Sequence, residues 1–223
     1  MIEIKDVRYL PYYSVPEASL YLGVAVSTLR AWIGRQSNFK PLIKPAQEDP
    51  LALSFINLIE LYVLMAMRRK HNLEMIKVRN ALKYVSNKYP SDHPLAEKSF
   101  ETDGINLFLE KAGLLYNVSE HGQIAMHNVI KQYLERIDRD RKGNPIRFYL
   151  LSRRDKPDQP KLILIDPKIS FGRPTVSEKS IPIDIIIERY AAGESIKELM
   201  SDYDCSQKEI EEALRVPISR QAA

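Results

Sequence analysis

Residues 14–33 carry two short stretches of helical periodicity separated by a single glycine. In the first stretch, Ala18, Tyr21 and Leu22 have i, i+3, i+4 spacing, which places apolar side chains on one helix face. Gly23 then supplies a tight turn, because glycine adopts left-handed backbone conformations without steric cost. The pattern predicts two helices joined by a sharp turn.

The second helix, expected over about residues 26–33, divides its side chains between an inner and an outer face. Its apolar side chains point inward: Leu29, Trp32 and Ile33. The outer face carries Ser27, Thr28 and Arg30, small polar and basic residues. This is the layout of a recognition helix, whose outer face contacts base edges in the major groove. We therefore predict that Ser27, Thr28 and Arg30 bind DNA; the alternative is a short helical hairpin within an ordinary α-helical domain.

A candidate wing follows this pair of helices. Two short apolar runs, 39–45 and 51–53, flank a polar tip with a proline, a pattern that predicts a small hairpin. Basic residues near it are expected to contact phosphates: Arg35, Lys40 and Lys44. With two longer helices at about 54–70 and 73–88, residues 1–90 are predicted to form a winged helix-turn-helix domain.

Residues 91–155 are predicted to form a small mixed β/α region. Short strands are expected at 99–101, 107–110 and 113–118, with a hairpin turn at Asp103-Gly104. A helix over about 123–137 and a strand over 146–151 follow. The polar segment 153–160 contains two prolines and predicts a linker.

Residues 161–223 are predicted to form a C-terminal three-helix unit after a short strand at 162–165. The helices are expected at about 182–192, 195–202 and 206–215. Capping boxes mark two of these starts and that of the first helix of the chain: Ser195–Glu198, Ser206–Glu209 and Ser14–Glu17. The unit resembles a helix-turn-helix in outline, but many of its expected surface positions are acidic: Glu194, Glu198, Asp202, Asp204, Glu209, Glu211 and Glu212. Because acidic surfaces repel phosphate, we predict protein binding for this unit.

Charge and composition add limits to this α+β, mostly α-helical fold class. The net charge of +4 is uneven, with +1 in residues 1–50, +5 in 51–160 and −2 in 161–223, so the two ends are expected to meet different partners. A single cysteine, Cys205, excludes a disulfide framework. The N-terminus lacks a signal-peptide pattern, and no apolar run reaches the roughly 18 residues that span a bilayer. We expect a cytoplasmic protein with no membrane partner.

Enzyme chemistry is not indicated by the sequence. The four histidines lack zinc-site spacing, the glycines form no phosphate-binding loop, and no nucleophile is flanked by a base and its orienting group. We predict no catalytic residues, no metal site and no cofactor.

Two groups of motifs resemble a known family. The C-terminal group is Ile165–Pro174, then Arg189-Tyr190-x-x-Gly193-Glu194-Ser195-Ile196 and Glu209-Ile210-x-x-Ala213-Leu214. It resembles the domain-of-unknown-function 433 family of VapB-type antitoxin-like proteins. The N-terminal group is Tyr21-Leu22-Gly23-Val24-x-x-Ser27-Thr28-Leu29-Arg30-x-Trp32, then Leu53-Ser54-Phe55-x-Asn57-Leu58-x-Glu60. It resembles the MerR-like winged helix in the long version of that family, except that Ala25 stands where a capping Ser or Thr is expected.

The resemblance implies an antitoxin of a type II toxin–antitoxin system. Such an antitoxin neutralises a PIN-like ribonuclease toxin and represses its own promoter. A homodimer is expected, because one short recognition helix contacts too few base pairs. The alternatives are a stand-alone MerR-like transcription regulator whose middle region senses a small molecule, and an adaptor that makes protein contacts only.

The run Phe171-Gly172-Arg173-Pro174 has two interpretations. In the structural one, Phe171 is buried and Arg173 pairs with Asp166 or Asp184. In the functional one, Arg173 projects into an acidic pocket of the ribonuclease partner. We take Phe171, Arg173 and Tyr190 as candidate partner contacts and favour the structural interpretation of the run itself.

Overall fold

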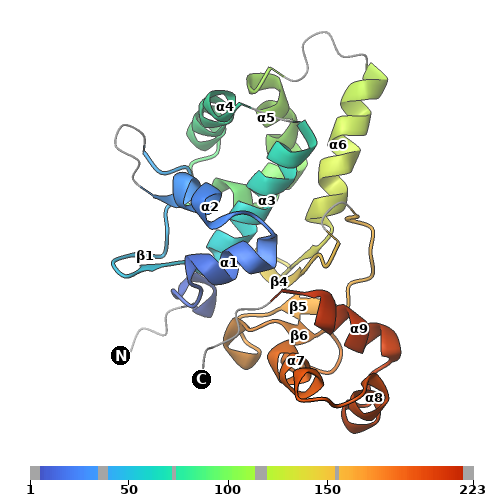
Figure 1. Ribbon diagram of the computed structural model, residues 1–223. Helices are drawn as coiled ribbons and strands as arrows, with labels where there is room; N and C mark the ends of the chain where they lie inside the picture. Colours follow the sequence, from blue (N-terminus) through green and yellow to red (C-terminus); the bar gives the residue numbers. More distant parts are fainter. Residues whose placement is uncertain (1–5, 35–39, 72–73, 114–119, 154–155, 218–223) are drawn as a thin grey trace.

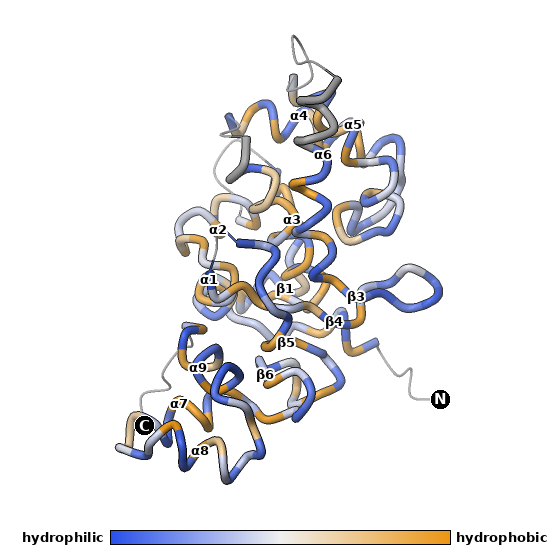
Figure 2. Tube along the Cα trace, turned by 90° about the vertical axis from the view of Figure 1, so that its right-hand side faces the viewer, coloured by the Kyte–Doolittle hydropathy of each residue, from blue (hydrophilic) through white to orange (hydrophobic). Residues whose placement is uncertain are grey.

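The computed structural model describes residues 6–34, 40–71, 74–113, 120–153 and 156–217 (Figure 1). It is a mixed α+β fold, mostly helical, with one hydrophobic core that runs from Tyr13 to Val216. This confirms the expected α+β, mostly α-helical class, whereas the winged helix-turn-helix arrangement stays a prediction. In Figure 2 the apolar segments concentrate around the long helix α3 and the strands beneath it.

The N-terminal helices have the predicted bounds. A 3-10 turn, η1 (Val7–Tyr9), precedes α1 (Val15–Leu22) and α2 (Val26–Ile33). The capping box between Ser14 and Glu17 is present, and Gly23 ends α1 with a left-handed backbone (φ 62°). Ala25 is the N-cap residue of α2, where its methyl side chain cannot accept a hydrogen bond.

The hairpin is present, but its first strand lies later than predicted. Strands β1 (Gln47–Glu48) and β2 (Leu51–Ala52) pair antiparallel around the turn at Asp49 and Pro50. The expected strand at 39–45 is wrong over residues 40–45, and residue 39 lies outside the described residues. Leu42 and Ile43 instead donate their amide hydrogens to the Trp32 carbonyl, 2.7 and 3.2 Å away, which holds the chain against the end of α2.

Helix α3 (Phe55–His71) is the centre of the fold. Every side chain from Leu53 to Met67 is buried, including the polar ones of Ser54, Asn57 and Glu60. Helix α4 (Met75–Lys88) follows it, as predicted to within two residues.

The strands predicted at 99–101 and 107–110 are wrong, because this segment is helical. The turn η2 (Pro94–Ala96) leads to a π-helical turn η3 (Phe100–Gly104), which continues directly into α5 (Ile105–Lys111). The buried side chains of Phe100, Phe108 and Leu109 recur at helical spacing and pack in the core beside α4. Gly104 has a helical backbone (φ −70°), so Asp103-Gly104 forms no hairpin turn. Most of the strand expected at 113–118 lies outside the described residues.

A four-stranded antiparallel sheet lies between α3 and the C-terminal helices (Figure 1). It follows α6 (Glu120–Leu134), which ends three residues before its predicted limit because Ile137 begins a strand. The sheet order is β3-β4-β5-β6, with bounds Ile137–Arg139, Pro145–Tyr149, Ile163–Ile165 and Thr175–Val176. Phe148 pairs with Ile165, and Ile163 pairs with Val176.

The proline-containing segment 153–160 connects two neighbouring strands of this sheet, β4 and β5. The guanidinium of Arg136, only 1% exposed, donates to carbonyls before and within the segment: those of Tyr149, Leu150, Pro157, Gln159 and Pro160. Because the strands before and after this segment pair with each other, the segment is a loop within one sheet and does not act as a flexible linker between separate parts of the described structure. Separate folding of 1–90, 91–155 and 161–223 stays a prediction.

The three C-terminal helices agree with the predictions. A short turn, η4 (Ser170–Gly172), precedes α7 (Ile183–Ala191), α8 (Ile196–Tyr203) and α9 (Gln207–Arg215). The capping boxes at Ser195 and Ser206 are both formed. These helices gather at the end of the molecule opposite α4 and α5 (Figure 1).

Candidate functional site

The outer face of α2 is open, as its periodicity predicts. Ser27 and Arg30 are exposed and Thr28 is half-buried, whereas Leu29, Trp32 and Ile33 are almost fully buried. The predicted base-contacting residues are therefore accessible on a helix whose inner face is packed in the core.

The α2 face continues into a groove that the sequence did not predict. The groove has a volume of about 370 Å³ and lies between α2, the end of α3 and α4. Its lining residues are Ser27, Thr28, Ala31, Trp32, Arg68, Met75, Ile76 and Arg79. We call it the α2–α4 groove. Tertiary packing brings three helices together here, so local periodicity alone could not reveal it.

Two arginines have fixed positions in the α2–α4 groove. The guanidinium carbon of Arg68 lies 5.7 Å from the centroid of the Trp32 ring, a cation–π contact. Arg79 Nη1 donates to the Lys40 carbonyl oxygen at 2.7 Å. This second contact ties α4 to the chain that leaves α2.

The predicted phosphate contacts are partly described. Lys40 and Lys44 are both exposed, and the backbone of each is anchored from another element. Lys40 is held by Arg79, and the Lys44 carbonyl accepts a hydrogen bond from Asn57 Nδ2 at 2.8 Å. Arg35 lies outside the described residues.

A buried polar cluster supports the chain that leads into the hairpin. Asn57 Oδ1 accepts the amide hydrogens of Ala46 and Ser54, and Asn57 Nδ2 donates to Glu60 Oε2 at 3.3 Å. His93 Nδ1 lies 2.9 Å from the same Glu60 oxygen. Burial raises the pKa of Glu60, although its hydrogen bonds oppose the shift. Burial lowers the pKa of His93, but the hydrogen bond and charge of Glu60 outweigh burial and raise it overall.

The turn before β6 presents an aromatic ring to solvent. Ser170, Phe171 and Gly172 all have left-handed backbones, with φ of 48°, 55° and 75°. Phe171 is 79% exposed, so the expectation that it is buried was wrong. The unusual backbone turns this side chain outward, which its hydrophobicity alone does not reveal.

Contacts with the N-terminal region fix that turn. The buried hydroxyl of Tyr13 donates to the Gly172 carbonyl oxygen at 3.0 Å. Arg173 Nη1 pairs with Asp184 Oδ2 at 2.7 Å, which confirms one of the two expected pairings. The other candidate, Asp166, pairs instead with Arg147 at 3.2 Å.

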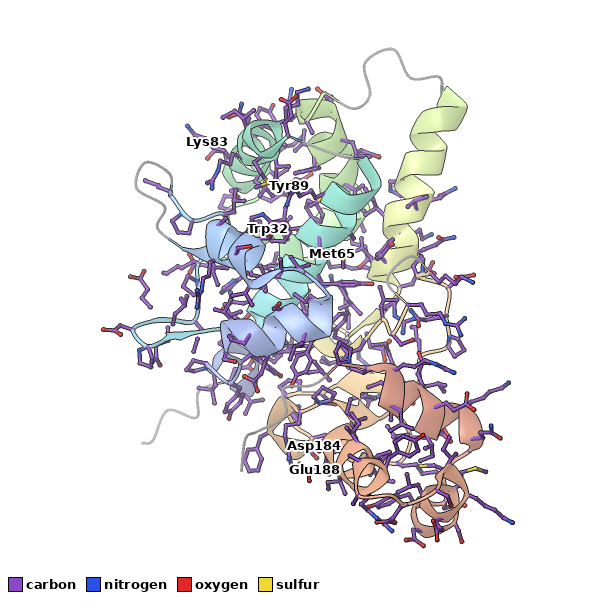
Figure 3. All side chains as sticks on the ribbon, in the orientation of Figure 1. Trp32, Met65, Lys83, Tyr89, Asp184 and Glu188 are labelled. Carbon is purple, nitrogen blue, oxygen red and sulfur yellow. The ribbon has the colours of Figure 1, made fainter. Side chains whose placement is uncertain are left out.

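The candidate partner contacts do not form one compact cluster with Tyr190. Tyr190 is 46% exposed and lies near the C-terminal end of α7, whereas Asp184, the partner of Arg173, lies near its beginning. Figure 3 shows Asp184 and Glu188 on this helix. Phe171 and Arg173 lie close together in the chain beside the start of α7, and Tyr190 is at the other end of that helix.

The acidic residues of the C-terminal helices are largely paired. Arg189 contacts Glu194 and Asp202, Lys179 contacts Asp204, and Arg215 contacts Glu211 and Glu212. Glu198 and Glu209 complete capping boxes. These pairs reduce the repulsive field that the sequence suggests, because opposite charges at contact cancel at longer range.

Among the described residues, no three His, Cys, Asp or Glu side chains gather in a way that could hold a metal ion. The described helices include none with the length and apolar character needed to cross a bilayer.

Comparison with known proteins supports the C-terminal resemblance. Residues 163–215 match the family model described as "Protein of unknown function (DUF433)". A curated relative from Mycobacterium tuberculosis (strain ATCC 25618 / H37Rv), named "Putative antitoxin VapB45", is 25% identical over 237 residues. That alignment covers 94% of this chain and 95% of the relative.

A solved structure shares the fold over almost the whole chain. It is the X-ray crystal structure of Rv2018 from Mycobacterium tuberculosis, with a TM-score of 0.70 and 23% identity. The match covers 92% of this chain and 98% of the other. The MerR-like character of the N-terminal region stays a prediction. The chain is therefore similar to the DUF433 family in its C-terminal unit and to a protein named as a putative antitoxin over most of its length.

Proposed function

We propose that the chain is the antitoxin of a type II toxin–antitoxin system, which binds a PIN-like ribonuclease and represses its own promoter. The observation that carries the DNA-binding part is the open outer face of α2, with Ser27, Thr28 and Arg30. The antitoxin part is supported by the similarity to the Mycobacterium tuberculosis relative over nearly the full length of both chains.

In the proposed complex, α2 enters the major groove of the promoter. Arg30 donates to guanine acceptors, and Ser27 and Thr28 contact neighbouring bases. Lys40 and Lys44 neutralise phosphates beside the hairpin, as does Arg35 in the adjoining segment. A homodimer places two such helices on two half-sites, which gives the specificity that one short helix lacks.

The toxin contact is proposed at Phe171. An aromatic ring on a fixed turn is a suitable anchor for a protein interface, because little conformational entropy is lost when it is buried. Arg173 is already paired with Asp184, so its entry into an acidic pocket requires that this ion pair break first. We therefore assign the main contact to Phe171, with Arg173 and Tyr190 at its margin. The proposed role is regulatory rather than enzymatic, in the cytoplasm.

The DNA contact is tested by fluorescence anisotropy with a duplex from the region upstream of the gene. Arg30→Ala is expected to weaken binding by about 1–3 kcal/mol, which is roughly 5- to 150-fold. Arg141→Ala is the matched control, since Arg141 is exposed in the β3–β4 turn. Equal affinity of wild type and Arg30→Ala would refute the assignment of the α2 face.

The toxin contact is tested by co-purification with the product of the neighbouring gene. Phe171→Ala is expected to lower affinity by about 2 kcal/mol or more, as for an interface hot spot. Tyr84→Ala removes another exposed aromatic side chain, on α4, and is expected to leave co-purification unchanged. Loss of the complex in both variants, or in neither, would argue against Phe171 as the anchor.

A further inference from the structure

The α2–α4 groove has features that DNA binding alone does not require. Met75 and Ile76 form part of its wall, and Ile76 is 53% exposed. The buried stripe of α4 consists of Val78, Ala81, Leu82 and Val85, and Ile76 lies outside it. A phosphate backbone gains little from such apolar surface, whereas an apolar ligand gains from covering it.

The groove also carries positive charge beside its apolar wall. Arg68 lies over the Trp32 ring, and among the described residues no carboxylate pairs with it. Arg79 adds a second guanidinium to the lining. The cation–π contact keeps the Arg68 guanidinium beside the Trp32 ring in the groove, where its donors can meet an anion.

Hydroxyl groups complete the lining on the α2 side. Ser27 and Thr28 each supply a donor and acceptor to the lining of the groove. The volume, about 370 Å³, lies within the range of small-molecule sites, roughly 300–1,000 Å³. Such sites commonly combine an apolar surface with a few polar groups that fix the orientation of the ligand.

We propose that the α2–α4 groove binds a small amphipathic anion, a compact apolar or aromatic body that carries one carboxylate. The carboxylate accepts hydrogen bonds from Arg68, with Arg79 as the second cation. The apolar body lies against Ile76, Met75 and Ala31.

This inference stands independently of the proposed function, but it has a consequence for it. Ser27 and Thr28 line the groove and also belong to the proposed DNA-binding face. A ligand in the groove would therefore compete with duplex DNA. In that case the chain responds to a small molecule through its N-terminal region, not through the middle region that the sequence suggested.

Binding is tested with 3-phenylpropanoate and its uncharged analogue 3-phenylpropanamide as probes. Trp32 is the single tryptophan of the chain and lines the groove, so its emission, excited at 295 nm, reports the site directly. The expected result is a saturable change with the carboxylate and a dissociation constant at least about tenfold higher for the amide, the loss expected for a charge-assisted hydrogen bond. Equal affinity for the two probes, or no saturable change, would overturn the proposal.

Two variants test which side chains form the site. Arg68→Gln is expected to lower the affinity for 3-phenylpropanoate at least about tenfold and to change the affinity for 3-phenylpropanamide little. Lys83→Gln removes the same charge from α4 at an exposed residue that does not line the groove, labelled in Figure 3, and is the control. Equal effects of the two variants would show a general charge effect and overturn the site.

A further variant covers the case in which Arg68→Gln does not fold. Ile76 is exposed, so Ile76→Ser is expected to fold normally and to weaken both probes several-fold. Unchanged affinity of Ile76→Ser for both probes would overturn the apolar half of the site. Displacement of promoter duplex by 3-phenylpropanoate is measured separately, so that a failure of DNA binding leaves the Trp32 titration interpretable.

Discussion

Substitution of Gly172 by alanine is expected to destabilise the junction between the N-terminal and C-terminal parts of the fold. A Cβ atom at this position would lie 2.2 Å from the Tyr13 hydroxyl oxygen, and the backbone has φ of +75°. The left-handed conformation costs an alanine about 1–2 kcal/mol. Displacement of the buried Tyr13 hydroxyl from the Gly172 carbonyl adds about 1–3 kcal/mol. The expected loss for Gly172→Ala is therefore about 2–5 kcal/mol.

Chemical denaturation of a double-mutant cycle separates these two contributions. In a Tyr13→Phe background the hydroxyl is gone, so Gly172→Ala is expected to cost less than in the wild type, mainly the backbone contribution. Gly193→Ala is the matched control, because Gly193 has φ of +104° and nothing within 4 Å of the added Cβ. If Gly172→Ala costs the same in both backgrounds, the steric argument is wrong.

Two other perturbations follow from buried polar groups. Arg136→Leu is expected to lower the free energy of unfolding, measured in urea, by about 3 kcal/mol or more, because it leaves several backbone carbonyls without their donor. The control, Arg141→Leu in an exposed turn, should change it by less than about 0.5 kcal/mol. Equal effects of the two variants would contradict the role of Arg136. The Glu60–His93 pair predicts pH dependence, since the folded-state pKa values of both groups are raised. The contribution of each group is complete below its ordinary pKa, 4.5 for Glu60 and 6.5 for His93, and is lost as pH rises through the higher folded value. Glu60→Gln removes one titration and the cause of the raised His93 pKa, so it should weaken the fall in stability as pH rises above 6.5. A variant with the same pH profile as wild type would exclude this pair as the cause.

Helix boundaries were predictable wherever the sequence carries a capping signal. Ser14, Ser195 and Ser206 each stand three residues before a glutamate, and all three helices begin there. The segment 99–111 lacks such a signal. Its short apolar runs are compatible with a strand or a helix, and burial of Phe100 and Phe108 in the core stabilises the helix.

The candidate sites were predictable to different extents. The exposure of Ser27 and Arg30 follows from the 3.6-residue period of α2, which the sequence displays. The exposure of Phe171 depends on three consecutive residues with left-handed backbones, and the first two are not glycine. The sequence therefore does not predict this conformation. The α2–α4 groove was not predictable, because Arg68, Ile76 and Arg79 meet α2 only through tertiary packing.

Site-specific photo-crosslinking tests the proposed DNA-binding face most directly. A benzophenone amino acid introduced in place of Ser27 is irradiated in the presence of the upstream duplex, with the same group in place of Arg141 as the control. The proposed function predicts a crosslink to DNA from position 27 and none from position 141. No crosslink from position 27 under conditions in which the duplex is bound would contradict it.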